Sequence, residues 1–325
     1  MLKVAILGAT GMVGQKFVEL LDSHPWFRVE AVAASERSVG LKYGQLTKWK
    51  LPTPIPEDVK ELEVLPVDTR AIGDVDVVYS ALPAEEAGKT EEEFAGAGYM
   101  VFSNASSHRM DEDVPILNPE VNCEHAIMID EQRKRRGWSG AIVTNPNCTT
   151  AILTLSLKPI KDEFGIRRIL VSSMQALSGA GYPGVASLDI TDNVIPFIKN
   201  EEEKMHRETL KIMGDLKKPA EFRVSASCHR VNTTDGHTEA VFIETQKEAQ
   251  PQIVAEVMSR FQAEPQRLGL PTAPKQPIIV RHEEDRPQPK LDRMEGRGMS
   301  VVVGRIRKDP DLNGFKYIVL GHNTV

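Results

Sequence analysis

Hydrophobic residues at the start of the chain form a short β-type run that is followed by a helical repeat. Residues 2–7 are mostly aliphatic and include β-branched side chains, which is typical of a buried strand. A glycine-containing segment, residues 8–14, separates this run from a helical pattern with apolar positions at Val13, Phe17, Val18, Leu20 and Leu21. We therefore predict a strand, a glycine turn and a helix in immediate succession.

Apolar runs and helical segments continue to alternate up to residue 147. Strands are predicted at residues 27–34, 75–82, 100–103 and 141–144, and helices at residues 84–97 and 130–138. Strands that alternate with helices indicate a doubly wound α/β sheet of parallel strands. Residues 51–66 are rich in proline and acidic side chains, so we expect a variable excursion there.

The pattern changes after residue 148. Helices are expected at residues 151–164 and 201–213, and strands at residues 168–174, 221–231, 238–245, 278–281, 300–307 and 316–320. A run of strands with few helices indicates an α+β domain with a mixed, largely antiparallel sheet. We therefore predict two domains, residues 1–147 and 148–325. Residues 264–289 are rich in proline and glutamine and are expected to form a long arm.

Composition narrows the class of protein. A net charge of −6 without a strongly basic stretch argues against a nucleic-acid partner, and the basic residues 133–136 are interpreted as a solvated helix face. No run of ~18 apolar residues suggests a membrane span, and the N-terminus leaves no room for a signal peptide, so we expect a cytoplasmic protein. Cys123, Cys148 and Cys228 lie far apart, which predicts neither a disulfide framework nor a metal site.

The glycine turn indicates a nucleotide cofactor. Gly8, Gly11 and Gly14 follow the spacing G-x-x-G-x-x-G between a first strand and a first helix, where a dinucleotide phosphate binds in Rossmann-like folds. The second predicted strand leads into Ser35-Glu36-Arg37-Ser38. An acidic side chain there would bind the ribose hydroxyls of NAD, whereas an Arg accommodates the 2′-phosphate of NADP. Arg37 and the two serines favour NADP, with an ordinary solvated loop as the alternative.

Cys148 is a candidate nucleophile. It lies between the strand at 141–144 and the following helix, and a helix N-terminus stabilises a thiolate, although many free cysteines only fill the core. His237 could supply a base, and Arg230, seven residues earlier, a cation for an anionic substrate. Arg109 follows a strand of the first sheet and suits a phosphate, a carboxylate or a surface salt bridge. Residues 175–184 contain three glycines that either admit a ligand or form a flexible turn.

These motifs together resemble the aspartate-semialdehyde dehydrogenase family, in its archaeal and fungal branch. The matching segments are GATGMVG at 8–14, AASERSVG at 33–40, SNASSHRMDEDVP at 103–115, NPNCTT at 145–150, QALSGAGYPG at 175–184 and CHRVNTTDGH at 228–237. The resemblance covers nearly the whole chain. It implies NADPH-dependent conversion of L-aspartyl 4-phosphate to L-aspartate 4-semialdehyde, on the route to lysine, threonine and methionine, by a homodimer or homotetramer.

The resemblance also implies roles for single residues. Cys148 would be the nucleophile, His237 the general acid/base, and Gln175 would orient the acyl intermediate. Arg230 would bind the substrate carboxylate, Arg109 the phosphoryl group with Lys204 near it, and Glu201 the substrate amino group, with Glu202 and Glu203 as open alternatives. The implied cofactor-binding residues are Gly8, Thr10, Gly11, Met12, Val13, Ser35, Arg37, Ser38, Ser80, Leu82, Ser178, Gly179 and Asn323.

Three alternatives accompany this interpretation. A malonyl-CoA reductase is similar over most of its length, but it lacks the Asn-Pro-Asn context of residues 145–147 and differs at the position of Gln175. N-acetyl-glutamyl-phosphate reductase matches the motifs less well. A non-catalytic NADP sensor would not need Cys148, Gln175, Arg230 and His237, all of which are present. Family members usually continue past residues 322–325 into a helix that returns to the cofactor domain, and we expect that helix to be absent here.

Overall fold

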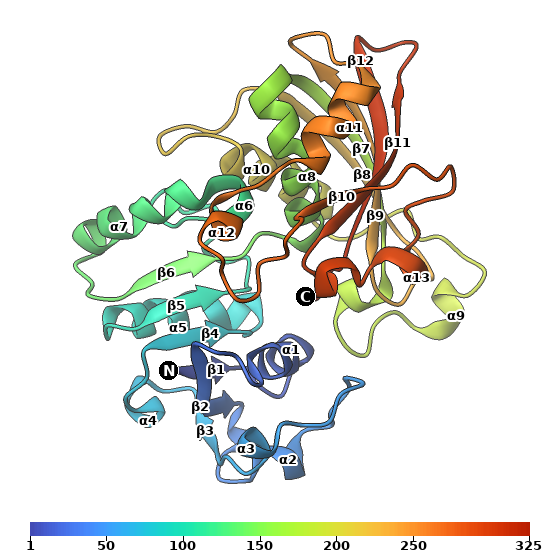
Figure 1. Cartoon of the computed structure of the whole chain (residues 1–325). Helices are drawn as coiled ribbons and strands as arrows, with labels where there is room; N and C mark the ends of the chain where they lie inside the picture. The colour runs from blue at the N-terminus through green and yellow to red at the C-terminus, as the bar shows by residue number, and fades with distance from the viewer. The chain divides into compact units, whose positions relative to one another are not determined.

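The computed structural model describes residues 1–325, which divide into two compact units. The first unit comprises Met1–Leu117 and Glu124–Pro146, and the second comprises Asn118–Cys123 and Asn147–Val325. We describe each unit by itself (Figure 1). Residues 118–123 and Asn147, which the sequence analysis placed in the first domain, belong to the second unit.

The first unit contains a six-stranded parallel sheet. Its strand order is β3-β2-β1-β4-β5-β6, and every neighbouring pair runs parallel. This is the order of a Rossmann-type sheet, so the predicted doubly wound α/β fold is confirmed. The strands are β1 (Leu2–Leu7), β2 (Phe27–Ala34), β3 (Val64–Pro66), β4 (Val77–Ser80), β5 (Met100–Ser103) and β6 (Ala141–Thr144).

Both faces of this sheet are covered. Val4 and Ile6 of β1 belong to one buried apolar cluster, and Ala5 and Leu7 belong to another, because successive side chains of a strand point to opposite faces. Burial on both faces explains why β1 is apolar from Val4 to Leu7. The helical segments of residues 1–146 are α1 (Met12–Leu21), η1 (Glu36–Ser38), α2 (Tyr43–Leu46), α3 (Glu57–Lys60), α4 (Thr69–Ile72), α5 (Ala84–Gly96), α6 (Pro119–Asn122), η2 (Cys123–Ile127) and α7 (Met128–Arg136).

Two sequence-based expectations for the first unit were wrong. The excursion at residues 51–66 contains α3 and the edge strand β3, which is only three residues long and therefore leaves too short a pattern to recognise. Val13 was expected on the apolar side of its helix, but its side chain is 40% exposed. The buried positions of α1 are Gly14, Gln15, Val18 and Leu21.

The second unit contains a mixed sheet. Its strand order is β10-β11-β12-β9-β7-β8, with antiparallel pairs in the middle and one parallel pair at each edge. The predicted mixed, largely antiparallel sheet is confirmed. The strands are β7 (Ile166–Gln175), β8 (Arg223–Arg230), β9 (His237–Thr245), β10 (Ile278–Val280), β11 (Val301–Lys308) and β12 (Gly314–Gly321).

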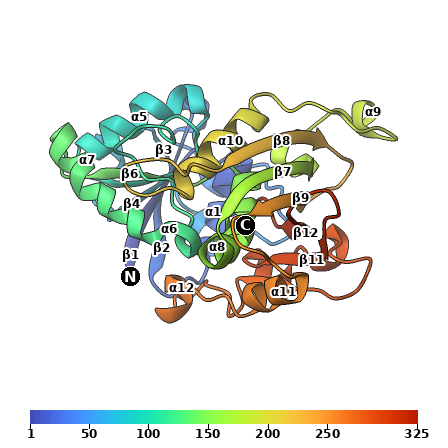
Figure 2. The same ribbon diagram turned by 90° about the horizontal axis from the view of Figure 1, so that it is seen from above.

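Helices α8 (Cys148–Phe164) and α10 (Glu201–Ile212) pack against this sheet, α8 on β12 and α10 on β8 (Figure 2). A hydrogen bond of 2.9 Å joins Ser156 Oγ of α8 to the Tyr317 hydroxyl of β12. The other helical segments are η3 (Leu177–Ala180), α9 (Ser187–Ile190), α11 (Pro251–Ser259), α12 (Glu264–Arg267), α13 (Pro289–Asp292) and η4 (Glu295–Gly298).

The region around residues 251–289 is more structured than the sequence suggested. Helix α11 was not predicted, and the expected long arm carries α12 at its start. Prolines occupy the first turns of both helices, where a missing N–H costs nothing, so proline content there does not indicate a loop. Across the whole chain, no helix is both long and apolar enough to cross a bilayer.

Candidate active site

Cys148 is the first residue of helix α8. The residue before it, Asn147, caps the helix: its side-chain oxygen accepts the Thr150 N–H at 3.1 Å. This cap satisfies one of the backbone N–H groups that a helix leaves open at its start. The remaining donors and the helix dipole favour a negative charge at the Cys148 sulfur, as the sequence predicted.

His237, the first residue of β9, faces the thiol. Its Nε2 lies 3.2 Å from Cys148 Sγ, and its Nδ1 accepts the backbone N–H of Ala176 at 3.0 Å. Because a backbone N–H only donates, Nδ1 carries a lone pair and the proton of the neutral ring is on Nε2, toward the sulfur. Complete burial, together with the positive charges of Arg230 and His322, lowers the pKa of His237 to about 3. The His237 ring is therefore neutral, with its Nε2–H directed at the Cys148 sulfur.

Glu201 connects the cysteine segment to Gln175. One carboxylate oxygen of Glu201 accepts hydrogen bonds from Gln175 Nε2 at 3.1 Å, Asn147 Nδ2 at 2.9 Å and Thr149 Oγ1 at 3.1 Å. Glu202 instead accepts the Cys228 N–H, and Glu203 pairs with Arg207. Of the three neighbouring acids, Glu201 is therefore the one that lies in the cysteine cluster.

A second carboxylate from α10 holds the same segment. Glu208 Oε2 accepts the backbone N–H of Asn147 at 2.6 Å, and the Glu208 side chain is buried. Sequence analysis missed both Glu208 and the capping role of Asn147. Two signals could have found them: an Asn directly before a helix is a preferred cap, and Glu208 lies two helical turns after Glu201 on the same face.

Arg230, the last residue of β8, forms a hydrogen bond with the backbone of Ala176, the residue that also binds His237. Its Nη1 donates to the Ala176 carbonyl at 2.6 Å, so Ala176 binds His237 through its N–H and Arg230 through its C=O. Burial lowers the pKa of Arg230, while Glu201 opposes this effect. Lys204 lies at the edge of the cluster, with its Nζ 3.8 Å from Glu201 Oε2.

The glycine-containing segment after β7 packs directly on this pair. A Cβ atom on Gly179 would lie 2.9 Å from Arg230 Nη1 and 2.9 Å from His237 Cε1, so this position requires glycine. Asn323 holds the segment from the other side: its Nδ2 donates to Ser178 Oγ at 2.8 Å, and its Oδ1 accepts the Gly236 N–H at 2.8 Å. The second unit thus brings together the predicted residues Cys148, Gln175, Ser178, Gly179, Glu201, Lys204, Arg230, His237 and Asn323.

The glycine turn of the first unit has the geometry of a phosphate-binding turn. Gly8 has a φ of +73°, and a Cβ there would lie 2.7 Å from the Ala81 carbonyl oxygen. A Cβ on Gly14 would lie 2.3 Å from the Gly8 carbonyl oxygen. Helix α1 begins at Met12 with Gly11 as its cap, which has no side chain to occupy the first N–H groups. Its N-terminus is therefore suited to an anion.

The other predicted cofactor residues of this unit lie in two environments. Arg37 is exposed on η1 between Ser35 and Ser38, and it forms no ion pair in the structure. Its guanidinium is therefore available for a phosphate. Ser80 and Leu82 have buried side chains at the end of β4, so a ligand would meet their backbone.

Arg109 lies in the loop that follows β5. Its side chain is buried, and its Nη2 donates to the Asn104 carbonyl at 2.9 Å within the same loop. Arg109 therefore belongs to the first unit, whereas the Cys148 cluster belongs to the second.

Two family descriptions match the chain. "Semialdehyde dehydrogenase, NAD binding domain" matches residues 3–129, and "Semialdehyde dehydrogenase, dimerisation domain" matches residues 157–325. Among curated relatives, the aspartate-semialdehyde dehydrogenase of Archaeoglobus fulgidus is 56% identical over 99% of this chain and 93% of that protein. The one from Methanothermobacter thermautotrophicus is 54% identical over 100% of this chain and 95% of that protein. A malonyl-CoA reductase (NADP) from Metallosphaera sedula is 42% identical over 100% and 92%, respectively.

Solved structures of aspartate semialdehyde dehydrogenases also resemble the chain. Aspartate semialdehyde dehydrogenase from Candida albicans, solved with NADP, superimposes with a TM-score of 0.91 at 39% identity, covering 100% of this chain and 94% of that one. Aspartate semialdehyde dehydrogenase II from Vibrio cholerae, complexed with ASA, gives a TM-score of 0.77 at 30% identity, with the same coverage.

Proposed function

The chain belongs to the aspartate-semialdehyde dehydrogenase family, and we propose that it carries out this family's reaction through a thioester on Cys148. The reaction is the NADPH-dependent reductive dephosphorylation of L-aspartyl 4-phosphate to L-aspartate 4-semialdehyde. One observation carries the assignment of the nucleophile: Cys148 Sγ at the start of α8 lies 3.2 Å from the Nε2 of a buried, neutral His237. A thiolate in this position can attack an acyl carbon.

In the acyl-transfer step, the Cys148 thiolate attacks the C4 carbonyl carbon of the aspartyl phosphate. The new C–S bond replaces the C–O bond to the phosphoryl group, which leaves as inorganic phosphate. We assign the substrate carboxylate to Arg230, the amino group to Glu201 and the phosphoryl group to Arg109, with Lys204 as a further cation. Gln175 is proposed to orient the acyl group. Open backbone N–H groups at the start of α8 support stabilisation of the oxyanion.

NADP is the cofactor, and bound NADPH supplies the hydride that reduces the thioester. The residues of the first unit fit it: the glycine turn leaves the α1 N-terminus open to the pyrophosphate, and Arg37 between two serines suits a 2′-phosphate. We propose that the pyrophosphate is bound by Gly8, Thr10, Gly11, Met12 and Val13. The 2′-phosphate is proposed to be bound by Ser35, Arg37 and Ser38. Ser178, Gly179 and Asn323 are proposed to lie at the nicotinamide.

His237 was expected to act as a general acid/base. Its geometry supports a narrower role, because the Ala176 N–H occupies Nδ1 and leaves Nε2–H as a donor toward sulfur. To accept a proton at Nε2, the ring would have to give up the Ala176 hydrogen bond. We therefore propose that His237 stabilises the thiolate before attack and again when the C–S bond of the thiohemiacetal breaks.

Reduction of malonyl-CoA is the second candidate function, because a malonyl-CoA reductase is 42% identical to this chain. Asn145, Asn147 and Gln175 favour the aspartyl phosphate reaction. The test is to follow NADP⁺ reduction with L-aspartate 4-semialdehyde, with and without phosphate, beside malonate semialdehyde with CoA. We expect phosphate-dependent turnover that is lost in Cys148→Ser. Turnover only with CoA would assign the chain to the reductase.

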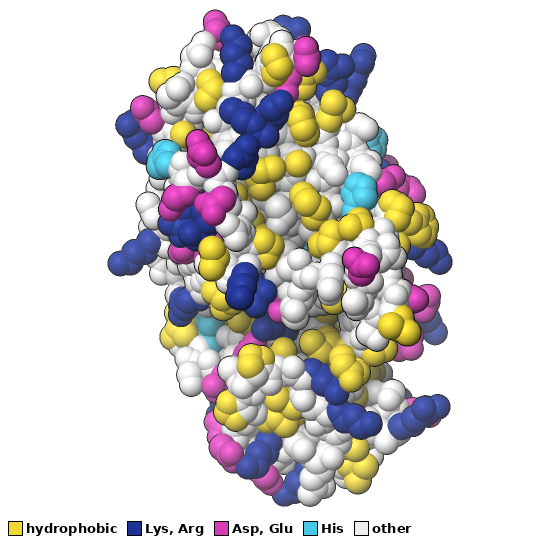
Figure 3. All heavy atoms as spheres, turned by 90° about the vertical axis from the view of Figure 1, so that its right-hand side faces the viewer, with side chains coloured by type: hydrophobic (Ala, Val, Ile, Leu, Met, Phe, Trp, Pro, Cys, Tyr) yellow, Lys and Arg dark blue, Asp and Glu magenta, His cyan; other side chains and the backbone are white.

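The dimerisation domain of the family makes up most of the second unit. Several large apolar side chains are exposed there, among them Leu188 at 90%, Phe197 at 70% and Tyr182 at 63%. Figure 3 shows hydrophobic side chains exposed among charged ones on one face of the molecule. We propose a homodimer or homotetramer that covers part of this surface, which sedimentation or light scattering would measure. A cytoplasmic location stays a prediction.

A further inference from the structure

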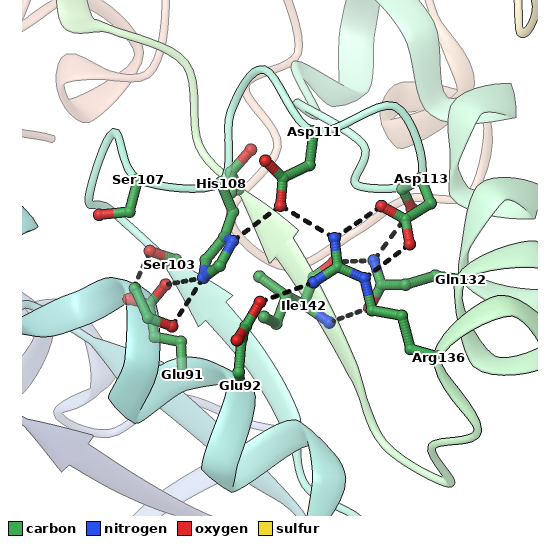
Figure 4. Close-up of polar contacts among 12 residues, drawn as sticks. Glu91, Glu92, Ser103, Ser107, His108, Asp111, Asp113, Gln132, Arg136 and Ile142 are labelled. Carbon is green, nitrogen blue, oxygen red and sulfur yellow. Dashed lines mark hydrogen bonds and ion pairs between the residues drawn. The ribbon is translucent and has the colours of Figure 1, made fainter.

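A polar network holds the loop that carries Arg109, and His108 is at its centre (Figure 4). We propose that His108 is a positioning residue for Arg109, so that the His108 ring sets where the guanidinium meets the phosphoryl group. This inference rests on the proposed role of Arg109 in binding that group. The His108 network consists of Glu91, Ser103, His108, Asp111 and Arg136.

Both nitrogens of the His108 ring face oxygen acceptors. Nε2 lies 2.9 Å from the Gly88 carbonyl oxygen, and Nδ1 lies 2.9 Å from Asp111 Oδ2. The Gly88 carbonyl oxygen and the Asp111 carboxylate both accept, so each ring nitrogen of His108 is placed to donate a hydrogen bond. The His108 side chain is buried, which makes these two contacts costly to lose.

On one side the His108 network is fixed to α7. Asp111 Oδ2, which binds His108, also accepts from Arg136 Nη2 at 2.9 Å. Arg136, the last residue of α7, forms a bidentate pair with Asp113 at 2.6 and 2.7 Å, which lowers the pKa of that carboxyl. It also donates to Glu92 of α5 at 3.0 Å. This half of the His108 network therefore ties the loop to two helices.

On the other side, Glu91 of α5 lies beneath the loop. Its Oε1 accepts the Ser103 hydroxyl at 2.7 Å, and its Oε2 lies 4.0 Å from His108 Nε2. Complete burial raises the pKa of Glu91, whereas the Ser103 hydrogen bond and the charges of His108 and Arg109 lower it. Glu91 thus places a buried carboxyl group close to both His108 and Arg109.

Arg109 depends on the conformation of this loop. Its Nη2 donates to the Asn104 carbonyl and its backbone N–H to the Ser106 carbonyl at 3.4 Å, and both of these contacts lie within the loop itself. His108 attaches the loop to α5 through Gly88 and to α7 through Asp111 and Arg136. Without the His108 ring, the conformation of residues 104–109 loses these attachments, and the Arg109 guanidinium loses its fixed position.

The test uses steady-state kinetics in the direction of semialdehyde oxidation, where inorganic phosphate is a substrate. His108→Leu removes both donors, His108→Asn keeps a donor near the position of Nδ1, and His108→Gln keeps one near Nε2. We expect His108→Leu to raise the KM for phosphate about tenfold, with kcat and the KM values for NADP⁺ and the semialdehyde within about twofold. His108→Asn and His108→Gln should show smaller increases. If His108→Leu does not fold, these two variants carry the test.

Two further variants separate the possible outcomes. His125→Asn changes another buried histidine, outside the loop, and should leave the phosphate KM unchanged. Arg109→Ala tests the proposed function itself. A raised phosphate KM in Arg109→Ala but in no His108 variant would overturn this inference alone. An unchanged phosphate KM in Arg109→Ala would overturn the role of Arg109, and the inference with it. If the His108 variants lower kcat and raise every KM to a similar extent, His108 has only a structural role.

Discussion

Cys148 Sγ lies 3.2 Å from His237 Nε2, while the other nitrogen of that ring accepts the Ala176 N–H. The hydrogen bond on Nδ1 determines which ring nitrogen carries the proton, so the Nε2 proton faces the sulfur. A neutral imidazole therefore directs its N–H toward the Cys148 sulfur.

Selective alkylation of Cys148 is the first prediction. Iodoacetamide should react with Cys148 at least about tenfold faster than with Cys228, because burial raises the pKa of Cys228 to about 11. His237→Asn should slow the reaction of Cys148, since the donor to the thiolate is lost. Mass spectrometry of tryptic peptides measures both rates, and equal, slow labelling of all three cysteines would argue against an activated thiol.

The acid sensitivity of folding should depend on His237. The unfolded chain takes up a proton on this residue below its ordinary pKa of 6.5, whereas the folded chain does so only near 3. The contribution of His237 to the free energy of unfolding is therefore fully present above pH 6.5. It falls as the pH drops toward 3, by at most about 1.4 kcal/mol for each pH unit. His237→Asn should flatten the dependence of the unfolding free energy on pH in this window. His282→Asn, at an exposed position, should not.

Glu208 should stabilise the start of helix α8. Glu208→Ala leaves the buried N–H of Asn147 without its acceptor and should lower the unfolding free energy by roughly 1–3 kcal/mol, together with kcat. Glu208→Gln keeps an acceptor and should lose less. Denaturant titration and steady-state assays measure the two effects. Glu203→Ala is the control on the same helix, because its ion pair with Arg207 is exposed and such pairs contribute about 1 kcal/mol at most.

Arg37 should determine the choice of cofactor. Arg37→Ala is expected to raise the KM for NADP⁺ by roughly tenfold to a hundredfold, because a charged hydrogen bond to the 2′-phosphate contributes about 1.5–3 kcal/mol. The KM for NAD⁺ should not rise. Glu36→Ala, at the neighbouring exposed position, should leave the NADP⁺ constant unchanged. A parallel rise for both cofactors would place Arg37 outside the 2′-phosphate site.

Apolar strands of four or more residues could be predicted from the sequence, whereas the three-residue strand β3 and the proline-led helix α11 could not. The strands at 2–7, 27–34 and 100–103 agree with the structure, because the buried parts of parallel strands are rich in aliphatic side chains. Strand β3 has three residues and shows no period. The position of Cys148 at a helix start was also predictable. The contribution of Ala176 was not, since a residue that acts through its backbone leaves no trace in side-chain chemistry.

Ala176 also has a consequence for substrate length. The N–H of Ala176 binds the His237 imidazole beside Cys148. The carbonyl of the same residue binds the Arg230 guanidinium, which is proposed to bind the substrate carboxylate. A single residue thus positions the two side chains that are proposed to act at opposite ends of the substrate. Because Ala176 holds both side chains, we expect acyl chains one methylene shorter or longer than aspartyl to fit less well between Cys148 and Arg230. The backbone of Ala176 would then contribute to the preference for a four-carbon acyl chain.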